Sequence, residues 1–322
     1  VRLTLHPGRA YLDEHISISN PTDGTHSYYF WNNTAFPNRA GTRFIYPMTL
    51  GTDHEGENFF TWPIHDGRDL TWLKNYPDPT SIFAHDCEFD FFGAYDVDRD
   101  YGIIQIANHH VTPGKKAWTW GNSDSGLASQ SVLTDEDGPY IEVQSGPLPT
   151  QADYGMLYPG QEISWREWWC PVIGLGQGFE YATKDIAVER VARDRDAELK
   201  ILSTAVYPEA HIEIRSGDGP PLSKVVNLTP DQPATVQLED LGEASFLLTI
   251  KDGEDRNLVS YMSPLEVPEV EIPRAPYIDE RASLPVEQTY IQGQKLDRQM
   301  NRFQAREWYE KALDRDRGHT AS

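Results

Sequence analysis

The 322-residue chain has few cysteines, few basic side chains and no long apolar run. Its two cysteines, Cys87 and Cys170, leave room for one disulfide bond, which the sequence neither requires nor excludes. Cys and His spacings typical of zinc sites are missing, so we expect no zinc centre. No stretch of 18 apolar residues occurs, which excludes a membrane-spanning helix.

The charge balance is strongly acidic. Acidic residues number 50 and basic residues 28, which gives a formal net charge of -22 at pH 7. Phosphate backbones and anionic lipid surfaces repel such a chain, so we expect neither nucleic acid nor membrane as a partner. The negative charge of the chain does not oppose binding of a neutral carbohydrate. The chain opens inside a strand-like pattern without Met or a signal peptide, which suggests a piece of a longer, cytoplasmic protein.

Short alternating runs of apolar and polar residues dominate residues 1–180, and turn signals such as NPTDG and VTPGKK separate them. No helical period of useful length interrupts these runs, which predicts a large antiparallel β-sandwich. Residues 181–196 have the character of a charged connector. Residues 197–266 contain further short runs at the spacing of a small immunoglobulin-like sandwich.

Near the C-terminus, the spacing of apolar residues changes from a strand-like to a helix-like period. Residues 267–285 are rich in Pro and acidic side chains and predict an extended linker. Residues 286–322 predict two helices, and small and aromatic residues fall at the offsets of a tetratricopeptide repeat: Gly293, Ala305, Tyr309 and Ala312. Arg317 stands where the usual closing proline would be. One repeat cannot bury its own apolar face, so we expect either further repeats after it or packing of this pair against the sandwich. Because tetratricopeptide-like helices are usually protein-binding surfaces, a protein partner is a further expectation.

One predicted strand between residues 118 and 171 carries a lone glutamate, Glu142. Side chains two apart on a strand share a face, so Tyr140, Glu142 and Gln144 should point one way, and Ile141 and Val143 the other. The apolar pair would fill a core. A carboxylate framed by Tyr, Gln and nearby Trp is typical of a sugar-binding surface, and a solvated outer face is the alternative.

Neighbouring residues could complete such a site. Trp118 and Trp120 share a strand face with Lys116 and could either stack on sugar rings or pack in a core. A second set could contact sugar hydroxyls: Trp31, Asn32, Asn33 and His65. His65 and His110 lie in predicted loops. They could be solvated or capping groups, or they could act as general acids.

Glycoside hydrolysis would need a second carboxylate near Glu142. Glu167 follows on the next predicted strand and shares a face with Trp165 and Trp169. Asp137 lies in the turn before the Glu142 strand, where its alternative role is to form the bend. Both are therefore candidate catalytic partners.

Motifs for cofactors are missing. The sequence contains no G-x-S-x-G elbow, P-loop or dinucleotide fingerprint, so we expect no cofactor. Asp96, Asp98 and Asp100 alternate as in a calcium loop, but Gly102 stands one position late and no Glu closes the loop. A hairpin turn explains these aspartates better than a metal site.

The order of these motifs resembles that of galactose-mutarotase-like domains, in which a glutamate strand precedes a loop, an LxPG string and a terminal strand. Here IEVQSG precedes LYPGQEISWREWWCPV, and SYYFWNNTAF resembles the strand with the G-H-P-Y-F-type motif. Strings such as FWNN, TRFIYP, FFGAYD and LTDEDGPYIE are similar to those of a bacterial family of unknown function. That family joins a mutarotase-like sandwich to tetratricopeptide repeats, and the resemblance covers roughly residues 1–322.

The resemblance implies a mainly β protein that acts on carbohydrate, with Glu142 as catalytic base. Two departures are visible. About one further half-sandwich would be expected before HPGRAYL, and Ser27 stands where the motif has the histidine acid of an epimerase. The leading hypothesis is therefore a glycoside hydrolase with Glu142 as general acid or base. An aldose 1-epimerase-like enzyme and a non-catalytic sugar-binding scaffold are the alternatives.

Overall fold

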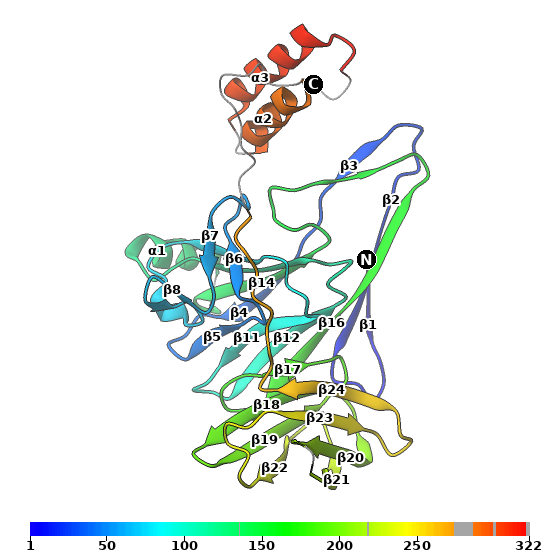
Figure 1. Ribbon diagram of the computed structural model, residues 1–322. Coiled ribbons are helices and arrows are strands. Elements are labelled where there is room, and N and C mark those ends of the chain that lie inside the picture. The colour runs from blue at the N-terminus through cyan, green and yellow to red at the C-terminus, as the bar shows by residue number, and fades with distance from the viewer. Residues whose placement is uncertain (135, 218, 274–285, 299–300, 320–322) are drawn as a thin grey trace.

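The computed structural model describes residues 1–134, 136–217, 219–273, 286–298 and 301–319. Its described residues form a large β-sandwich, a smaller β-unit and a pair of helices, as Figure 1 shows. The predicted mainly β architecture is thus confirmed. None of the helices in these ranges is long and apolar enough to cross a membrane.

The first sheet of the large sandwich, here called sheet A, joins six strands among the described residues. In spatial order they are β1 (Arg2–Leu5), β2 (Leu12–Ser19), β16 (Glu162–Ile173), β12 (Tyr101–Ala107), β11 (Phe91–Asp96) and β5 (Thr42–Ile45). A tight hairpin joins β11 to β12, and Asp96 Oδ1 accepts the backbone N–H groups of Asp98 and Arg99. The predicted hairpin at the three aspartates is therefore confirmed.

The second sheet, sheet B, also joins six described strands. In spatial order they are β4 (Asn32–Pro37), β14 (Tyr140–Gly146), β13 (Gly114–Thr119), β10 (Thr80–Ala84), β6 (Leu50–Thr52) and β7 (Phe59–Thr61). Short strands form two further ribbons: β3 (His26–Tyr28) with β15 (Gly155–Leu157), and β8 (Ile64–His65) with β9 (Arg68–Asp69). A single 3-10 turn, η1 (Leu73–Asn75), precedes β10.

Helix α1 (Asp124–Leu133) interrupts the β pattern, where the sequence predicted no helix. The Ser123 hydroxyl caps it by accepting the Gly126 N–H. Only Gly126 and Gln130 of this helix are buried. Because α1 has no apolar stripe, the usual sequence signal of a helix is missing.

The core of the sandwich lies between sheets A and B. Ile141 and Val143 are fully buried there, together with Phe44, Ile82 and Phe92. The alternation predicted for the β14 strand is therefore confirmed, and Tyr140, Glu142 and Gln144 lie on its outer face. Burial of such side chains is the main stabilising contribution to the sandwich.

The smaller β-unit packs two four-stranded sheets against each other. One contains β17 (Tyr181–Ala182), β18 (Ile186–Arg193), β19 (Asp196–Ser203) and β22 (Ala234–Leu238). The other contains β21 (Leu222–Leu228), β20 (Tyr207–Arg215), β23 (Phe246–Lys251) and β24 (Asn257–Ser263). Residues 181–196 therefore form strands rather than the predicted connector, because Ile186 and Val188 alternate into this core.

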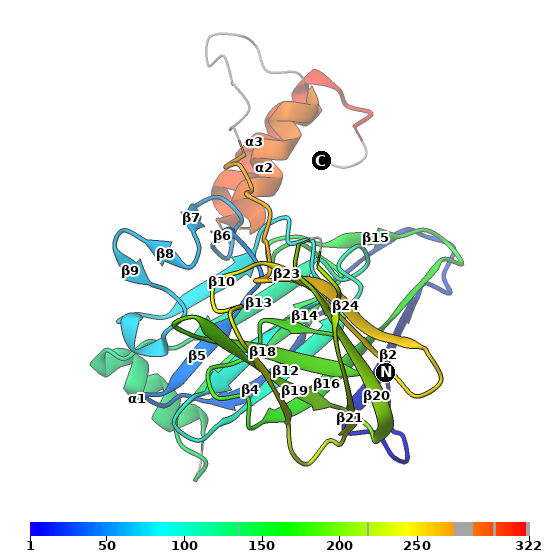
Figure 2. The same ribbon diagram turned by 60° about the horizontal axis from the view of Figure 1, so that its bottom comes forward.

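The C-terminal helices are α2 (Val286–Arg298) and α3 (Arg302–Arg315). Figures 1 and 2 show them apart from the sheets, and Lys295 forms an ion pair of 2.9 Å with Glu57 of the β6–β7 loop. Ala305 and Ala312 are buried, and a methyl group on Gly293 would come within 2.7 Å of the Tyr309 ring. A helical pair is thus present where predicted, while its tetratricopeptide type stays a prediction.

The linker predicted at 267–285 lies mostly outside the described residues. Its first part runs along the large sandwich, where the Thr49 hydroxyl donates to the Pro268 carbonyl at 2.9 Å and accepts the Val270 N–H at 3.0 Å. Cys87 and Cys170 both carry free thiols, which settles the question of a disulfide bond.

Gly93 on β11 offers a test of how tightly sheet A is built. A methyl group there would lie 2.0 Å from the carbonyl oxygen of Ile103, a backbone atom that cannot rotate away. We expect Gly93→Ala to lower the free energy of unfolding by about 3 kcal/mol, as overpacking does. Gly24→Ala, whose nearest contact would be 3.8 Å away, is the matched control for urea titration. Equal midpoints for the two variants would contradict this packing.

Candidate functional site

The outer face of sheet B carries most of the residues predicted to bind sugar. Strand pairing sets Trp118 on β13 opposite Glu142 on β14, and Lys116 opposite Gln144. We call this surface the Glu142 face, which consists of Lys116, Trp118, Trp120, Tyr140, Glu142 and Gln144. Side chains directly opposite in such a ladder lie about 5 Å apart at Cβ, and diagonal neighbours about 7–8 Å. Glu142 and Lys116 are diagonal neighbours.

A chain of hydrogen bonds connects Glu142 to Lys116. Gln144 Nε2 donates to Glu142 Oε2 at 2.6 Å. Gln144 Oε1 accepts from Gln151 Nε2 at 3.2 Å, and Gln151 Oε1 accepts from Lys116 Nζ. Two glutamines therefore hold a carboxylate and an ammonium group on one surface.

Lys116 is buried by aromatic rings. Its Nζ lies 5.5 Å from the ring centre of Phe83 and 5.4 Å from that of Trp118. Burial lowers the pKa of Lys116 to about 8, although the nearby Glu142 opposes the change. An ammonium group with this pKa can release a proton near neutral pH, unlike an ordinary lysine.

Half-buried aromatic side chains continue the Glu142 face. Trp118 and Trp120 meet edge to face at 5.3 Å, and Trp120 lies 6.3 Å from Tyr140. Trp31 packs edge to face on Phe83 at 5.5 Å, and its buried Nε1 has no hydrogen-bond partner in the described residues. These rings give the surface both apolar area and indole N–H donors.

Other predicted residues lie elsewhere. Asn33 is exposed on β4 opposite Gln144, so it borders the Glu142 face. His65 lies in the β8–β9 ribbon near Thr61, at the far edge of sheet B. His110 contacts His109 in the turn after β12, with tilted rings whose centres lie 3.9 Å apart. Asp137 is an exposed turn residue, and no hydrogen bond joins it to Glu142 in the described part of the chain.

The structure does not bring Glu167 to Glu142. Glu167 points into the interior between the sheets, where it accepts from Trp165 Nε1 at 2.8 Å and from Gln105 Nε2 at 2.9 Å. Its direct partner across the strands is Glu14 on β2. Sheet B, with Ile141 and Val143 of its β14 strand, therefore separates the Glu14–Glu167 pair from the Glu142 face.

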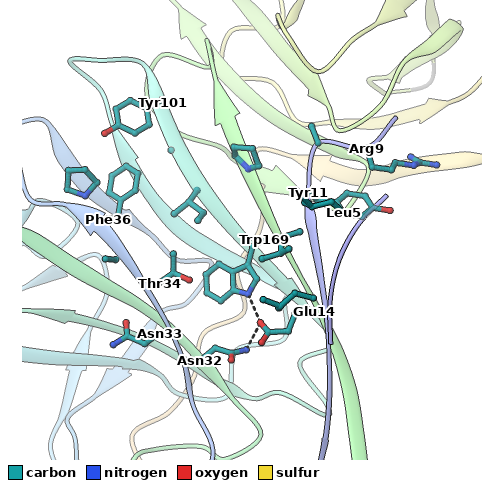
Figure 3. Close-up of a pocket in the computed structure, with 18 residues that line it drawn as sticks. Leu5, Arg9, Tyr11, Glu14, Asn32, Asn33, Thr34, Phe36, Tyr101 and Trp169 are labelled. Atoms are coloured by element: carbon teal, nitrogen blue, oxygen red, sulfur yellow. Dashed lines mark hydrogen bonds between the residues drawn. The ribbon is translucent and has the colours of Figure 1, made fainter. Parts of the chain in front are cut away.

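Glu14 lines a cavity of about 830 Å³ between the edge strand β4 and sheet A. Figure 3 shows Asn32 and Trp169 pointing at Glu14, and both donate to its Oε2, at 3.0 and 3.3 Å. The walls are mostly apolar and include Leu12, Phe36, Ile103 and Pro171. Asn32, predicted as a sugar contact, is thus a partner of Glu14.

Sequence reasoning missed Glu14, although a signal was present. In LDEHISIS, Glu14 alternates with Leu12 and Ile16, so it lies on the face that turns inward. Burial and the charge of Glu167 raise the pKa of Glu14. A carboxylate on an apolar strand face is the pattern that would have indicated this buried pair.

Glu14→Gln should stabilise the protein at pH 7. The amide oxygen keeps both hydrogen bonds, while the repulsion by Glu167 disappears. Because the folded-state pKa of Glu14 is raised, its ionisation costs stability as the pH rises above about 4.5. The gain should reach up to about 1 kcal/mol at pH 7 and vanish near pH 4. Urea titrations at both pH values test this, and an equal effect at both would contradict it.

A family model described as a domain of unknown function (DUF5107) matches residues 1–172 of the chain. The chain belongs to this DUF5107 family. The matched region contains both sheets of the large sandwich and the whole Glu142 face. A second model, described as the second domain of a YphG-like protein, matches residues 181–261, which form the smaller β-unit. The predicted membership in a family of unknown function is thereby confirmed for this DUF5107 protein.

Three solved structures resemble parts of the DUF5107 protein. A tetratricopeptide-repeat-domain protein from Parabacteroides distasonis is 24% identical, with a TM-score of 0.47, over 53% of this chain and 29% of its own. A protein from Klebsiella pneumoniae assigned as an aldose 1-epimerase is 14% identical, with a TM-score of 0.37, over 54% of this chain and 46% of its own.

The third is an Escherichia coli K12 protein with the same assignment, 11% identical with a TM-score of 0.37, over 51% of this chain and 57% of its own. The DUF5107 chain thus spans less than two thirds of the length of each of these proteins. Likeness of this degree establishes no activity.

Proposed function

We propose that the Glu142 face binds a free aldose and exchanges its anomers by proton transfer. The observation that carries this proposal is the diagonal placement of Glu142 and Lys116 on one sheet face, where the pKa of the Lys116 ammonium group lies at about 8. A base and an acid on one face, both held by glutamines, suit a reaction that moves two protons at neighbouring oxygens of a sugar. The resemblance to mutarotase-like domains points to the same substrate class.

In the proposed step, each proton that leaves or reaches the sugar is taken up or given by Glu142 or Lys116. The Glu142 carboxylate removes the proton of the anomeric hydroxyl, and the Lys116 ammonium gives a proton to the ring oxygen. The bond between C1 and the ring oxygen breaks, and the open-chain aldehyde forms. After rotation about the C1–C2 bond, closure on the opposite face of the carbonyl returns both protons. Lys116 would thereby act as the acid, the role of the motif histidine at whose position this sequence has Ser27.

Hydrolysis, the leading hypothesis from the sequence, has less support from the geometry. It needs a second carboxylate close to Glu142. Neither Asp137 nor Glu167 contacts Glu142 among the described residues, and Glu167 lies beyond the β14 strand, between the two sheets. We therefore favour anomer exchange, and new reducing ends from an oligosaccharide would favour the hydrolase instead.

The tryptophans would hold the sugar ring. Trp118 stands directly opposite Glu142, so a ring stacked on its face places C1 near the carboxylate. Calorimetric titration with D-glucose, D-galactose and D-xylose tests this proposal. Trp118→Ala should weaken binding about tenfold or more, whereas Trp308→Ala on α3 should have no effect. If Trp118→Ala and Trp308→Ala bound the sugars with equal affinity, the Glu142 face would not be the sugar-binding site.

A further inference from the structure

A second cavity, of about 470 Å³, lies where the large sandwich meets the smaller β-unit. Its walls come from β5, from β18 and from the segment that follows β24. Aromatic residues line one part of it: Phe44, Tyr46, Trp62 and Phe179. This volume is in the usual range for sites of small organic molecules.

Arg43 on β5 is the cation of this cavity. Its guanidinium lies 5.0 Å from the ring centre of Trp72, and its Nη2 donates a hydrogen bond to the Thr71 hydroxyl at 3.4 Å. The Arg43 Nε is buried and has no partner in the described residues. Guanidinium stays charged in proteins, so the cavity is lined by a cation that has no ion-pair partner among the described residues.

Glu189 on β18 and Glu269 in the segment after β24 also line the cavity, and no ion pair joins either carboxyl group to Arg43 in the described part of the chain. Burial and the neighbouring Glu180 raise the pKa of Glu189 to about 8, so its carboxyl group is mostly uncharged at pH 7. Glu180 itself is held by Tyr261, Ser263 and the Leu265 N–H. The buried Tyr46 hydroxyl has no hydrogen-bond partner among the described residues. Arg43 Nε and the Tyr46 hydroxyl are thus the two buried polar atoms at this cavity that have no partner in the described ranges.

We propose that this cavity binds a small organic carboxylate, with Arg43 as its ion-pair partner. The fork of the guanidinium matches the two oxygens of a carboxylate, which would supply the missing partner. The aromatic walls at Phe44, Trp62 and Phe179 call for an organic body rather than an inorganic anion. This site is independent of the Glu142 face, from which the core of the large sandwich separates it.

Calorimetry on the full chain at pH 7 tests the proposal with benzoate, D-glucuronate and D-gluconate. Their uncharged counterparts, benzamide, D-glucose and D-sorbitol, are the comparison set. At least one carboxylate should bind about tenfold or more tightly than its counterpart, since a charge-assisted hydrogen bond is lost in the latter. Failure of all three carboxylates, or tighter binding of inorganic phosphate, would overturn the proposal.

Arg43→Met separates binding from folding. It should abolish the preference for the carboxylate, yet keep or raise the thermal midpoint without ligand, because it removes a partly buried charge that has no ion-pair partner among the described residues. Arg166→Met, at an exposed cation on β16, is the matched control and should bind like the wild type. Unchanged carboxylate binding in a folded Arg43→Met protein would contradict the role of Arg43.

Discussion

Glu142→Gln should slow anomer exchange by about 100-fold or more, which is the usual loss when a general base is removed. The amide keeps the size of the side chain and can still accept the hydrogen bond from Gln144 Nε2. It cannot take up the proton of the anomeric hydroxyl. Exchange of D-galactose and D-glucose anomers, followed by NMR magnetisation transfer, measures the effect directly.

Two controls make the Glu142→Gln result specific. Asp137→Asn changes an exposed acidic group in the turn before β14 and should leave the rate unchanged. Thermal midpoints of wild type and Glu142→Gln should agree closely, because Glu142 is half-buried and keeps its neighbour. A Glu142→Gln protein with the wild-type exchange rate would refute Glu142 as the base.

The exchange rate should fall as the pH rises through about 8, where the folded protein loses the Lys116 proton. Only the ammonium form can protonate the ring oxygen. Lys116→Met should therefore be slower by about 100-fold at pH 7 and should lack this limb of the pH profile. A pH profile that is unchanged in Lys116→Met would assign the limb to another group.

Stability gives a second readout for Lys116. Its folded-state pKa of about 8 lies below the ordinary value of 10.5, so the folded state binds fewer protons than the unfolded state between these pH values. Stability from this group should accordingly rise between pH 8 and 10.5, by an amount on the order of 3 kcal/mol. Lys116→Met should lose that rise and should be no less stable than the wild type at pH 7.

Alternation along single strands predicted the parts of the site that depend on local pattern. The inward direction of Ile141 and Val143 and the shared face of Tyr140, Glu142 and Gln144 both follow from the two-residue period of a strand. The β11–β12 hairpin and the two C-terminal helices followed in the same way from local sequence. These features need no knowledge of which strands are neighbours.

Features that depend on long-range pairing could not be read from the sequence. The lowered pKa of Lys116 follows from its burial beside Phe83, a residue on another strand, and the diagonal neighbour Glu142 only partly opposes this effect. Glu167 shares its face with Trp165 and Trp169 as predicted, but that face turns inward and meets Glu14, which lies 153 positions earlier in the chain. Helix α1 also could not be predicted, because its apolar residues do not recur with the 3.6-residue period of a helix.

The central claim is that the Glu142 face exchanges the anomers of a free sugar. One measurement tests it most directly: NMR magnetisation transfer between the α and β anomers of D-glucose, D-galactose, D-xylose and L-arabinose with wild-type protein. We predict that at least one sugar exchanges faster than in buffer, without new products, and that Glu142→Gln removes this acceleration. Exchange at the buffer rate for all four sugars would contradict the account.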